Sequence, residues 1–123
     1  MYTFDTNAVI YYLNQDFNAV KKVNKIIKSN SIIYFSTISE AELFSFKELL
    51  DADIIKINDV LNTLNVIPVD SRIARIAGFL KRNINIKIAD SIIAATALST
   101  NGILLTRNVK DFKGIPNLKI EAV

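Results

Sequence analysis

The sequence predicts an α/β fold in which helices cover both faces of a mainly parallel sheet of four or five strands. Short apolar segments that suit strands alternate with longer segments of helical period, a pattern typical of parallel sheets. Half of the 123 residues are hydrophobic and 22% are charged, which is close to the globular average. A chain of this length can build one hydrophobic core but not two. We therefore expect a single domain that spans residues 1–123.

The expected strands are short and apolar. Pro68 indicates that one of them ends there or lies at a sheet edge, because proline cannot donate a hydrogen bond to a neighbouring strand. The strands are expected at residues 2–4, 32–35, 66–69, 103–105 and 118–120.

Helical segments are expected between these strands. In the second of them, Val20, Val23 and Ile27 recur at helical period and predict the buried face. Gly102 suits the position just after the C-cap of the last long helix. The helices are expected at residues 6–13, 17–29, 36–49, from Asp51 or Asp53 to Leu64, from Asp70 or Ser71 through Leu80, and 88–100.

The composition excludes several kinds of chemistry. Without Cys or His there is no disulfide, no Cys/His zinc site, no thiol nucleophile and no Ser-His-Asp triad. Three scattered glycines exclude a glycine-rich phosphate loop. A net charge of +3 and a pI near 9.2 lean toward polyanionic partners. No apolar stretch approaches the length of a membrane span and no leader pattern is present, so we expect a cytoplasmic protein that does not bind membranes.

Three acidic residues lie at positions that are unusual for surface acids, namely directly after a strand or among apolar positions of a helix. Asp5 follows the first strand, where it is either a helix N-cap or a site residue. Glu42 shares a helical face with Ile38, Ala41, Ser45 and Leu49, so it either requires a partner or reaches water at the margin of that face.

Asp90 is the third of these acids. It lies among apolar positions in the first turn of a helix, where it could equally be a partner of the helix dipole. The positions that share its face are Ile86, Ile93, Ala94 and Ala97.

These carboxylates would repel one another in a common cleft unless a cation neutralised them or their pKa values rose. Oxygen ligands without imidazole or thiolate indicate a hard ion such as Mg²⁺ or Mn²⁺. Such ions commonly meet phosphate oxygens, so this set of acids favours phosphodiester hydrolysis.

Four segments in order resemble the four motifs of PIN domains, and most closely those of the VapC-type ribonuclease toxins of prokaryotic toxin–antitoxin pairs. The resemblance extends from about residue 2 to residue 121. The segments are Asp5–Asn7, Ser36–Leu43, Ala89–Ala97 and Leu105–Phe112.

The resemblance implies a three-layer α/β/α sandwich, a Mg²⁺- or Mn²⁺-dependent ribonuclease and a small antitoxin partner. Asp5, Glu42 and Asp90 match the first three acids of the family and become the expected catalytic and metal-binding residues. Many members have a fourth acid where this chain has Asn108, whose amide can still ligate a metal or position water but brings no charge. Asp111, three residues on, can supply the missing carboxylate, so Asn108, Asp111 or both are expected to complete the catalytic site.

Neighbouring polar and basic residues are assigned supporting roles. In the motifs, Thr6, Asn7, Ser39 and Thr106 are expected to support the site. Arg107, Lys110 and Lys113 adjoin the fourth motif and are candidates for RNA-phosphate contacts. Lys21, Lys25 and Lys28 share one helical face, which is more often simply solvated than bound to RNA.

Two other classes of function remain alternatives. One is a PIN-like module that binds RNA or protein without cutting, and the other is a phosphotransfer enzyme with Asp5 as nucleophile. The second normally has another Asp two positions on, where this chain has Asn7.

Two pairs of aromatic residues suggest a partner surface. Adjacent helical positions point about 100° apart, so Tyr11 and Tyr12, and likewise Phe44 and Phe46, either pack in the core or lie in part at the surface. The resemblance implies that exposed aromatics here line a groove for an amphipathic antitoxin segment. A homodimer, or a higher toxin–antitoxin assembly, is expected as well.

Overall fold

The computed structural model describes residues 1–123 and contains one five-stranded sheet. Its strands are β1 (Tyr2–Phe4), β2 (Ile33–Ser36), β3 (Asn65–Ile67), β4 (Ile103–Thr106) and β5 (Lys119–Ala122). They are ordered β3-β2-β1-β4-β5, and every neighbouring pair is parallel. The chain leaves β1 in one direction toward β2 and β3 and later returns to its other side as β4. The strand order therefore reverses at β1, the position at which ligands bind in open α/β sheets.

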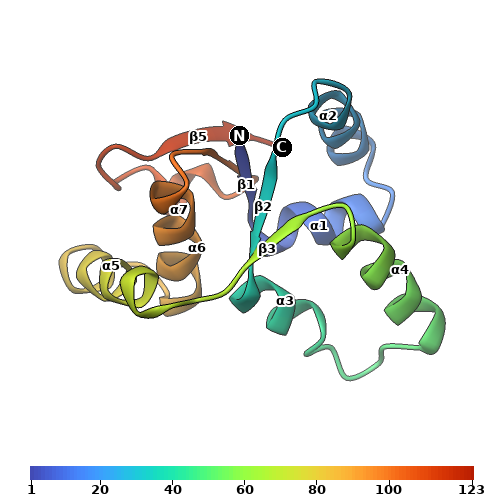
Figure 1. The fold of residues 1–123 in the computed structure, drawn as a ribbon, viewed down its shortest axis with the longest axis horizontal. Helices are drawn as coiled ribbons and strands as arrows, with labels where there is room; N and C mark the ends of the chain where they lie inside the picture. Colours follow the sequence, from blue (N-terminus) through green and yellow to red (C-terminus); the bar gives the residue numbers. More distant parts are fainter.

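Helices cover both faces of this sheet, as the sequence predicts (Figure 1). α1, α2 and α4 lie on one face, and α5, α6 and α7 on the other. α3 follows β2 directly and contacts both α1 and α6. None of the helices has the length and hydropathy needed to cross a membrane. The helices are α1 (Thr6–Leu13), α2 (Phe17–Lys28), α3 (Thr37–Leu43), α4 (Asp51–Leu61), α5 (Ser71–Asn83), α6 (Ile88–Ser99) and α7 (Val109–Phe112).

The expectation of one hydrophobic core is wrong: each face of the sheet carries its own cluster of eleven buried apolar residues, because the sheet lies between them. Phe4 and Phe35 anchor the cluster under α1, α2 and α4, whereas Leu104 and Phe112 belong to the cluster under α5, α6 and α7. Because both faces of the sheet are covered, the three central strands β1, β2 and β4 are largely buried along their length and read as short apolar runs. The edge strands β3 and β5 contain exposed polar residues, Asn65 and Lys119.

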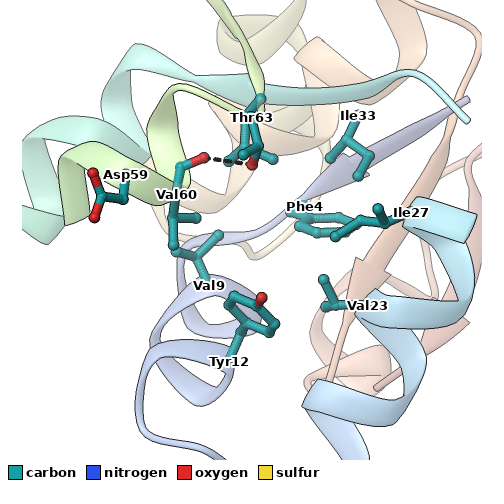
Figure 2. Close-up of a pocket in the computed structure, with 10 residues that line it drawn as sticks. Phe4, Val9, Tyr12, Val23, Ile27, Ile33, Asp59, Val60 and Thr63 are labelled. Atoms are coloured by element: carbon teal, nitrogen blue, oxygen red, sulfur yellow. Dashed lines mark hydrogen bonds between the residues drawn. The ribbon is translucent and has the colours of Figure 1, made fainter. Parts of the chain in front are cut away.

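A pocket of about 220 Å³ opens within the first cluster (Figure 2). Val9 of α1, Val23 of α2 and Val60 of α4 surround it together with Phe4 of β1. Ile27 of α2, which is 45% exposed, also lines it. This part of the core therefore reaches the surface between three helices.

The third predicted helix is shorter than expected. α3 ends at Leu43 rather than at residue 49. The Ser45 hydroxyl donates to the Glu42 carbonyl at 2.7 Å, so a side chain takes the acceptor that a continuing helix would have used. The helix predicted to reach Leu64 likewise stops at Leu61 as α4, where the Thr63 hydroxyl donates to the Val60 carbonyl at 2.7 Å.

The buried face of α2 is shifted by one position from the predicted one. Ala19, Val23 and Ile26 are buried, whereas Ile27 is largely exposed. The predicted strand end at Pro68 is confirmed, because β3 ends at Ile67 and is an edge strand.

Gly102 has a different role from the predicted one. Asn101, with φ of 53°, is the left-handed residue after α6. Gly102 instead allows the chain to pass close to β1, since a Cβ there would lie 3.2 Å from the backbone oxygen of Met1.

Candidate active site

The carboxyl ends of the central strands meet at a hollow of about 260 Å³, here called the acidic hollow. Asp5 follows β1, Glu42 lies on α3 directly after β2, and Asp90 lies in the first turn of α6. The structure thus brings together the three acids that the sequence singles out. The acidic hollow is lined by Asp5, Thr6, Asn7, Ile10, Glu42, Ser45, Phe46, Asp90 and Ile93.

Asp5 is both the N-cap of α1 and a side chain of the acidic hollow. Its Oδ1 accepts the Ala8 N–H at 2.7 Å, and its Oδ2 accepts the Thr106 hydroxyl at 2.5 Å. Burial raises the pKa of Asp5, the two hydrogen bonds oppose that rise, and the charges of Asp90 and Glu42 add to it. The two interpretations of Asp5 in the sequence are therefore compatible.

Glu42 lies at the margin of the buried face of α3. That face consists of Ser39 and Leu43, while Ala41 is exposed, so the predicted apolar stripe around Glu42 is wrong. The reason is that α3 has only seven residues. Glu42 is partly exposed, and its Oε1 accepts the Thr6 hydroxyl at 2.6 Å. Its carboxylate is thus oriented by a residue of the first motif.

Asp90 has no hydrogen-bond partner within the chain. Burial raises the pKa of this carboxyl, the charges of Asp111 and Glu42 raise it further, and Lys87 opposes the rise. Asp90 lines one hollow with Asp5 and Glu42 and a neighbouring hollow with Lys87 and Asp111. The positions predicted to share its face are buried as expected, namely Ile86, Ile93, Ala94 and Ala97.

The fourth motif reaches the site from β4. Thr106 is fully buried, and its Oγ1 also accepts the Asn108 N–H at 3.0 Å. Asn108 is exposed at the N-cap of α7 and lines neither hollow described here. Asp111 is also exposed, but it lies beside Asp90 in a second hollow of about 290 Å³. Of the two candidates for the fourth position, Asp111 is therefore the one adjacent to Asp90.

The supporting residues have distinct positions. Thr6 and Thr106 each donate a hydroxyl to a carboxylate of the acidic hollow, and Asn7 lines that hollow. Ser39 is fully buried, and its hydroxyl has no hydrogen-bond partner. Ser39 therefore makes no bond to the acids.

Arg107 is engaged elsewhere, contrary to the expected phosphate contact. Two of its terminal N–H groups donate to Asp16 at 2.8 and 3.2 Å, and its Nε donates to the Val123 carbonyl at 2.8 Å. The guanidinium also lies 3.9 Å from the centre of the Tyr11 ring. Hydrogen bonding to Arg107 lowers the pKa of Asp16 to about 2. Arg107 thus joins β4, the start of α2 and the last residue.

The acidic side chains of the two adjoining hollows fit a hard divalent cation. Asp5, Glu42, Asp90 and Asp111 offer carboxylate oxygens, and none of them is in a salt bridge. No three acidic side chains lie close enough together to hold an ion jointly in this conformation. The chemistry of the ligands therefore fits Mg²⁺ or Mn²⁺, although they do not form a closed cage.

The sequence analysis did not identify two lysines that lie near the site. The second hollow, here called the lysine hollow, is lined by Lys81, Asn85, Ile86, Lys87, Asp90 and Asp111. The available signal was the position of Lys87, three residues before Asp90. Lys81 gave no local signal, because the packing of α5 beside α6 brings it there.

Comparisons with known proteins show which family this chain resembles. A family model described as the PIN domain matches residues 2–118. Ribonuclease VapC2 of Rickettsia felis (strain ATCC VR-1525 / URRWXCal2) is 29% identical over 98% of this chain and 96% of its own length.

Solved structures share the fold. VapBC2 from Rickettsia felis, bound to a DNA fragment from its promoter, contains a chain with a TM-score of 0.84 and 27% identity, covering 99% of this chain and 98% of that one. A chain of VapBC-1 from nontypeable Haemophilus influenzae gives a TM-score of 0.81 and 27% identity, covering 98% of this chain and 96% of that one.

Proposed function

Because this chain belongs to the PIN-domain family, whose model matches residues 2–118, we propose that it is an endoribonuclease that uses Mg²⁺ or Mn²⁺ to hydrolyse RNA phosphodiester bonds. The observation that carries the proposal is the convergence of Asp5, Glu42 and Asp90 on one hollow without a cationic partner. The similarity to a ribonuclease over nearly the whole chain favours RNA as the substrate.

The chain's own residues would hold and orient the reacting groups. When bound, a divalent ion would neutralise the carboxylates, activate a water molecule and stabilise charge on the phosphate oxygens. Asp5, Glu42 and Asp90 would hold the ion, with Asp111 beside Asp90. Thr106 and Ala8 fix both oxygens of Asp5, and Thr6 fixes one oxygen of Glu42. This preorganisation reduces the rearrangement needed during reaction.

Cleavage assays test this function directly. Purified protein should cut single-stranded RNA in Mg²⁺ or Mn²⁺, lose the activity in EDTA, and leave a phosphomonoester intact. Asp90→Asn should abolish cleavage without lowering the unfolding temperature. Glu48→Gln, an exposed acid outside both hollows, is the matched control and should cleave as the parent does. Full activity of Asp90→Asn would remove that residue from the mechanism.

The fourth position is proposed to belong to Asp111 rather than Asn108. Asp111 adjoins Asp90 and carries a charge that can offset a cation, whereas Asn108 lines neither hollow. Asp111→Asn should therefore weaken Mn²⁺ binding, measured by calorimetry, more than Asn108→Ala does. The reverse order would assign the role to Asn108.

We also propose a small antitoxin as partner, supported by similarity to chains solved in toxin–antitoxin complexes. A largely apolar hollow of about 350 Å³ lies between α1, the end of α3 and α4. Ile10 and Phe46 line both this hollow and the acidic hollow, so the two adjoin. An amphipathic segment could occupy the apolar part and direct a basic residue at the carboxylates.

The aromatic residues support this location. Phe44 and Phe46 are 39% and 53% exposed, whereas Tyr12 packs against the core and Tyr11 lies on Arg107. Phe46 is the aromatic residue that lines the proposed groove itself.

Co-expression with the product of the adjacent reading frame tests the partner. It should give a stable complex with suppressed cleavage. Replacing Phe46 with Asp should disrupt the complex, while Phe17→Asp, at a 78% exposed position outside the groove, should not. Tyr12 packs against the core and does not line the groove, so it is left unchanged in this test. Unchanged binding by the folded Phe46→Asp variant would place the partner elsewhere. Light scattering of the free chain would test the proposed homodimer.

A further inference from the structure

The acidic hollow lacks the positive charge that an RNA strand needs. It contains three carboxylates, and no Lys or Arg lines it. A phosphodiester carries a negative charge and would be repelled from these groups. Positioning of a nucleic-acid strand normally relies on basic side chains that contact its phosphates. Such side chains should therefore lie directly beside the acidic hollow.

The lysine hollow meets this requirement. It shares Asp90 with the acidic hollow, and only one of its six lining residues is apolar. Lys81 and Lys87 are the only basic residues that line either hollow. Neither forms a salt bridge, although Asp90 and Asp111 line the same hollow. Two positive charges are thus available beside the proposed cleavage site.

One of these lysines is held in place by the backbone. The Lys81 Nζ donates to the Ile86 carbonyl at 2.9 Å, which fixes the ammonium group at the wall of the hollow. An ammonium group has three N–H donors, so two remain for a ligand. The Asn85 side chain lines the same hollow and makes no hydrogen bond within the chain, so it offers a further donor.

The other basic residues near the fourth motif do not compete for this role. Arg107 is bound to Asp16 and to the carbonyl of Val123. Lys110 and Lys113 are exposed but line neither hollow. The lysine hollow is therefore the basic surface in contact with the catalytic acids.

We propose that the lysine hollow binds the backbone phosphate that neighbours the scissile one in single-stranded RNA, with Lys81 and Lys87 as its ligands. The proposal rests on the ribonuclease function proposed above and adds the path of the substrate. The strand crosses Asp90, with the bond to be cut in the acidic hollow. Because the contact is to a phosphate, it carries no sequence preference.

Binding of labelled RNA separates this contact from catalysis. The parent for the test is Asp5→Asn, which should bind RNA without cutting it. Fluorescence anisotropy with two oligonucleotides of unrelated sequence gives the affinity at several salt concentrations. Adding Lys87→Ala should weaken binding of both about 5-fold and reduce the slope of log affinity against log salt by about 0.7. Lys87→Arg should retain most of the affinity.

Two further variants control for fold and charge. Lys113→Ala removes an equal charge from an exposed position outside both hollows and should change affinity less than 2-fold. Lys81→Ala should act as Lys87→Ala does, and its unfolding temperature reports the loss of its bond to Ile86. In the chain with Asp5 intact, Lys81→Ala and Lys87→Ala should each raise KM.

The outcomes distinguish the two proposals. If the intact chain cleaves RNA but Lys81→Ala and Lys87→Ala bind like their parent with the same salt slope, the phosphate lies elsewhere and this inference is wrong. Equal losses in Lys113→Ala and Lys87→Ala would show a diffuse charge effect and also overturn it. Absence of both cleavage and RNA binding would instead overturn the ribonuclease function, and the lysine hollow with it.

Discussion

Replacing Thr106 with valine removes one hydroxyl from the centre of the site with little change in shape. That hydroxyl donates to Asp5 Oδ2 at 2.5 Å and accepts the Asn108 N–H at 3.0 Å. A hydrogen bond to a charged group contributes about 1.5–3 kcal/mol. The Asn108 N–H is near the surface, where water can replace its acceptor. We therefore expect Thr106→Val to lower the free energy of unfolding by about 2–3 kcal/mol at pH 7.

The same substitution has a defined pH dependence. The hydroxyl stabilises the ionised form of Asp5 and so opposes the rise of its pKa that burial causes. Without it the pKa of Asp5 rises further. The loss of stability should thus be largest at high pH, where Asp5 is ionised, and should shrink as the pH falls and Asp5 takes up a proton.

Urea unfolding of Thr106→Val and Thr106→Ser measures this effect. Serine keeps the hydroxyl and loses one buried methyl group, worth about 0.8 kcal/mol. At about 3–5 °C per kcal/mol for a chain of this length, the valine variant should melt roughly 10 °C below the wild type. If the two variants are equally stable at pH 7, or if the deficit of the valine variant does not change with pH, the hydrogen bond to Asp5 is not its cause.

Three further predictions concern stability. Asp5→Asn should raise the unfolding temperature at pH 7, because it removes a carboxylate whose pKa is raised by burial. This gain should vanish below pH 3.8, where the wild-type acid is protonated, and a lower unfolding temperature at pH 7 would contradict the prediction. Arg107→Lys should lower the unfolding temperature above pH 3.8, and the difference from the wild type should disappear toward pH 2, because the pKa of Asp16 is lowered to about 2. A difference in unfolding temperature that does not change with pH would show that the ion pair is not responsible. Gly102→Ala should lower the free energy of unfolding by about 1–3 kcal/mol, because its Cβ would meet a backbone oxygen at 3.2 Å. Gly78→Ala, in α5 with open space around it, should raise the free energy of unfolding by about 0.5–1 kcal/mol. Equal effects of the two substitutions in urea unfolding would rule out the close approach at Gly102.

Local patterns predicted most of the fold because each element follows them. The three central strands are largely buried on both faces, and α1 and α5 begin after side chains that cap them, Asp5 and Asp70. The end of α3 was missed, because the hydrogen bond of Ser45 to a backbone carbonyl competes with the helix and leaves no trace in periodicity.

Site residues that follow a strand could be predicted from the sequence. Pairs of side chains that meet only through tertiary packing could not. Asp5 could be placed from its position after the central strand. The partner of Arg107 could not, because Asp16 lies 91 residues away and only tertiary packing brings the two together. Lys81 reaches the site for a similar reason, through the packing of α5 against α6.

The central position of β1 also determines when the site can form. Strand β1 consists of residues 2–4, yet one of its two neighbours, β4, begins at residue 103. The hydrogen bond between Thr106 and Asp5 spans 101 positions of sequence. Contacts of such long range close late in folding, because the intervening chain must be ordered first. During synthesis, an emerging chain would therefore carry Asp5 and Glu42 long before it could orient them. The proposed nuclease would acquire its activity only after β4 and Thr106 had left the ribosome and paired with β1.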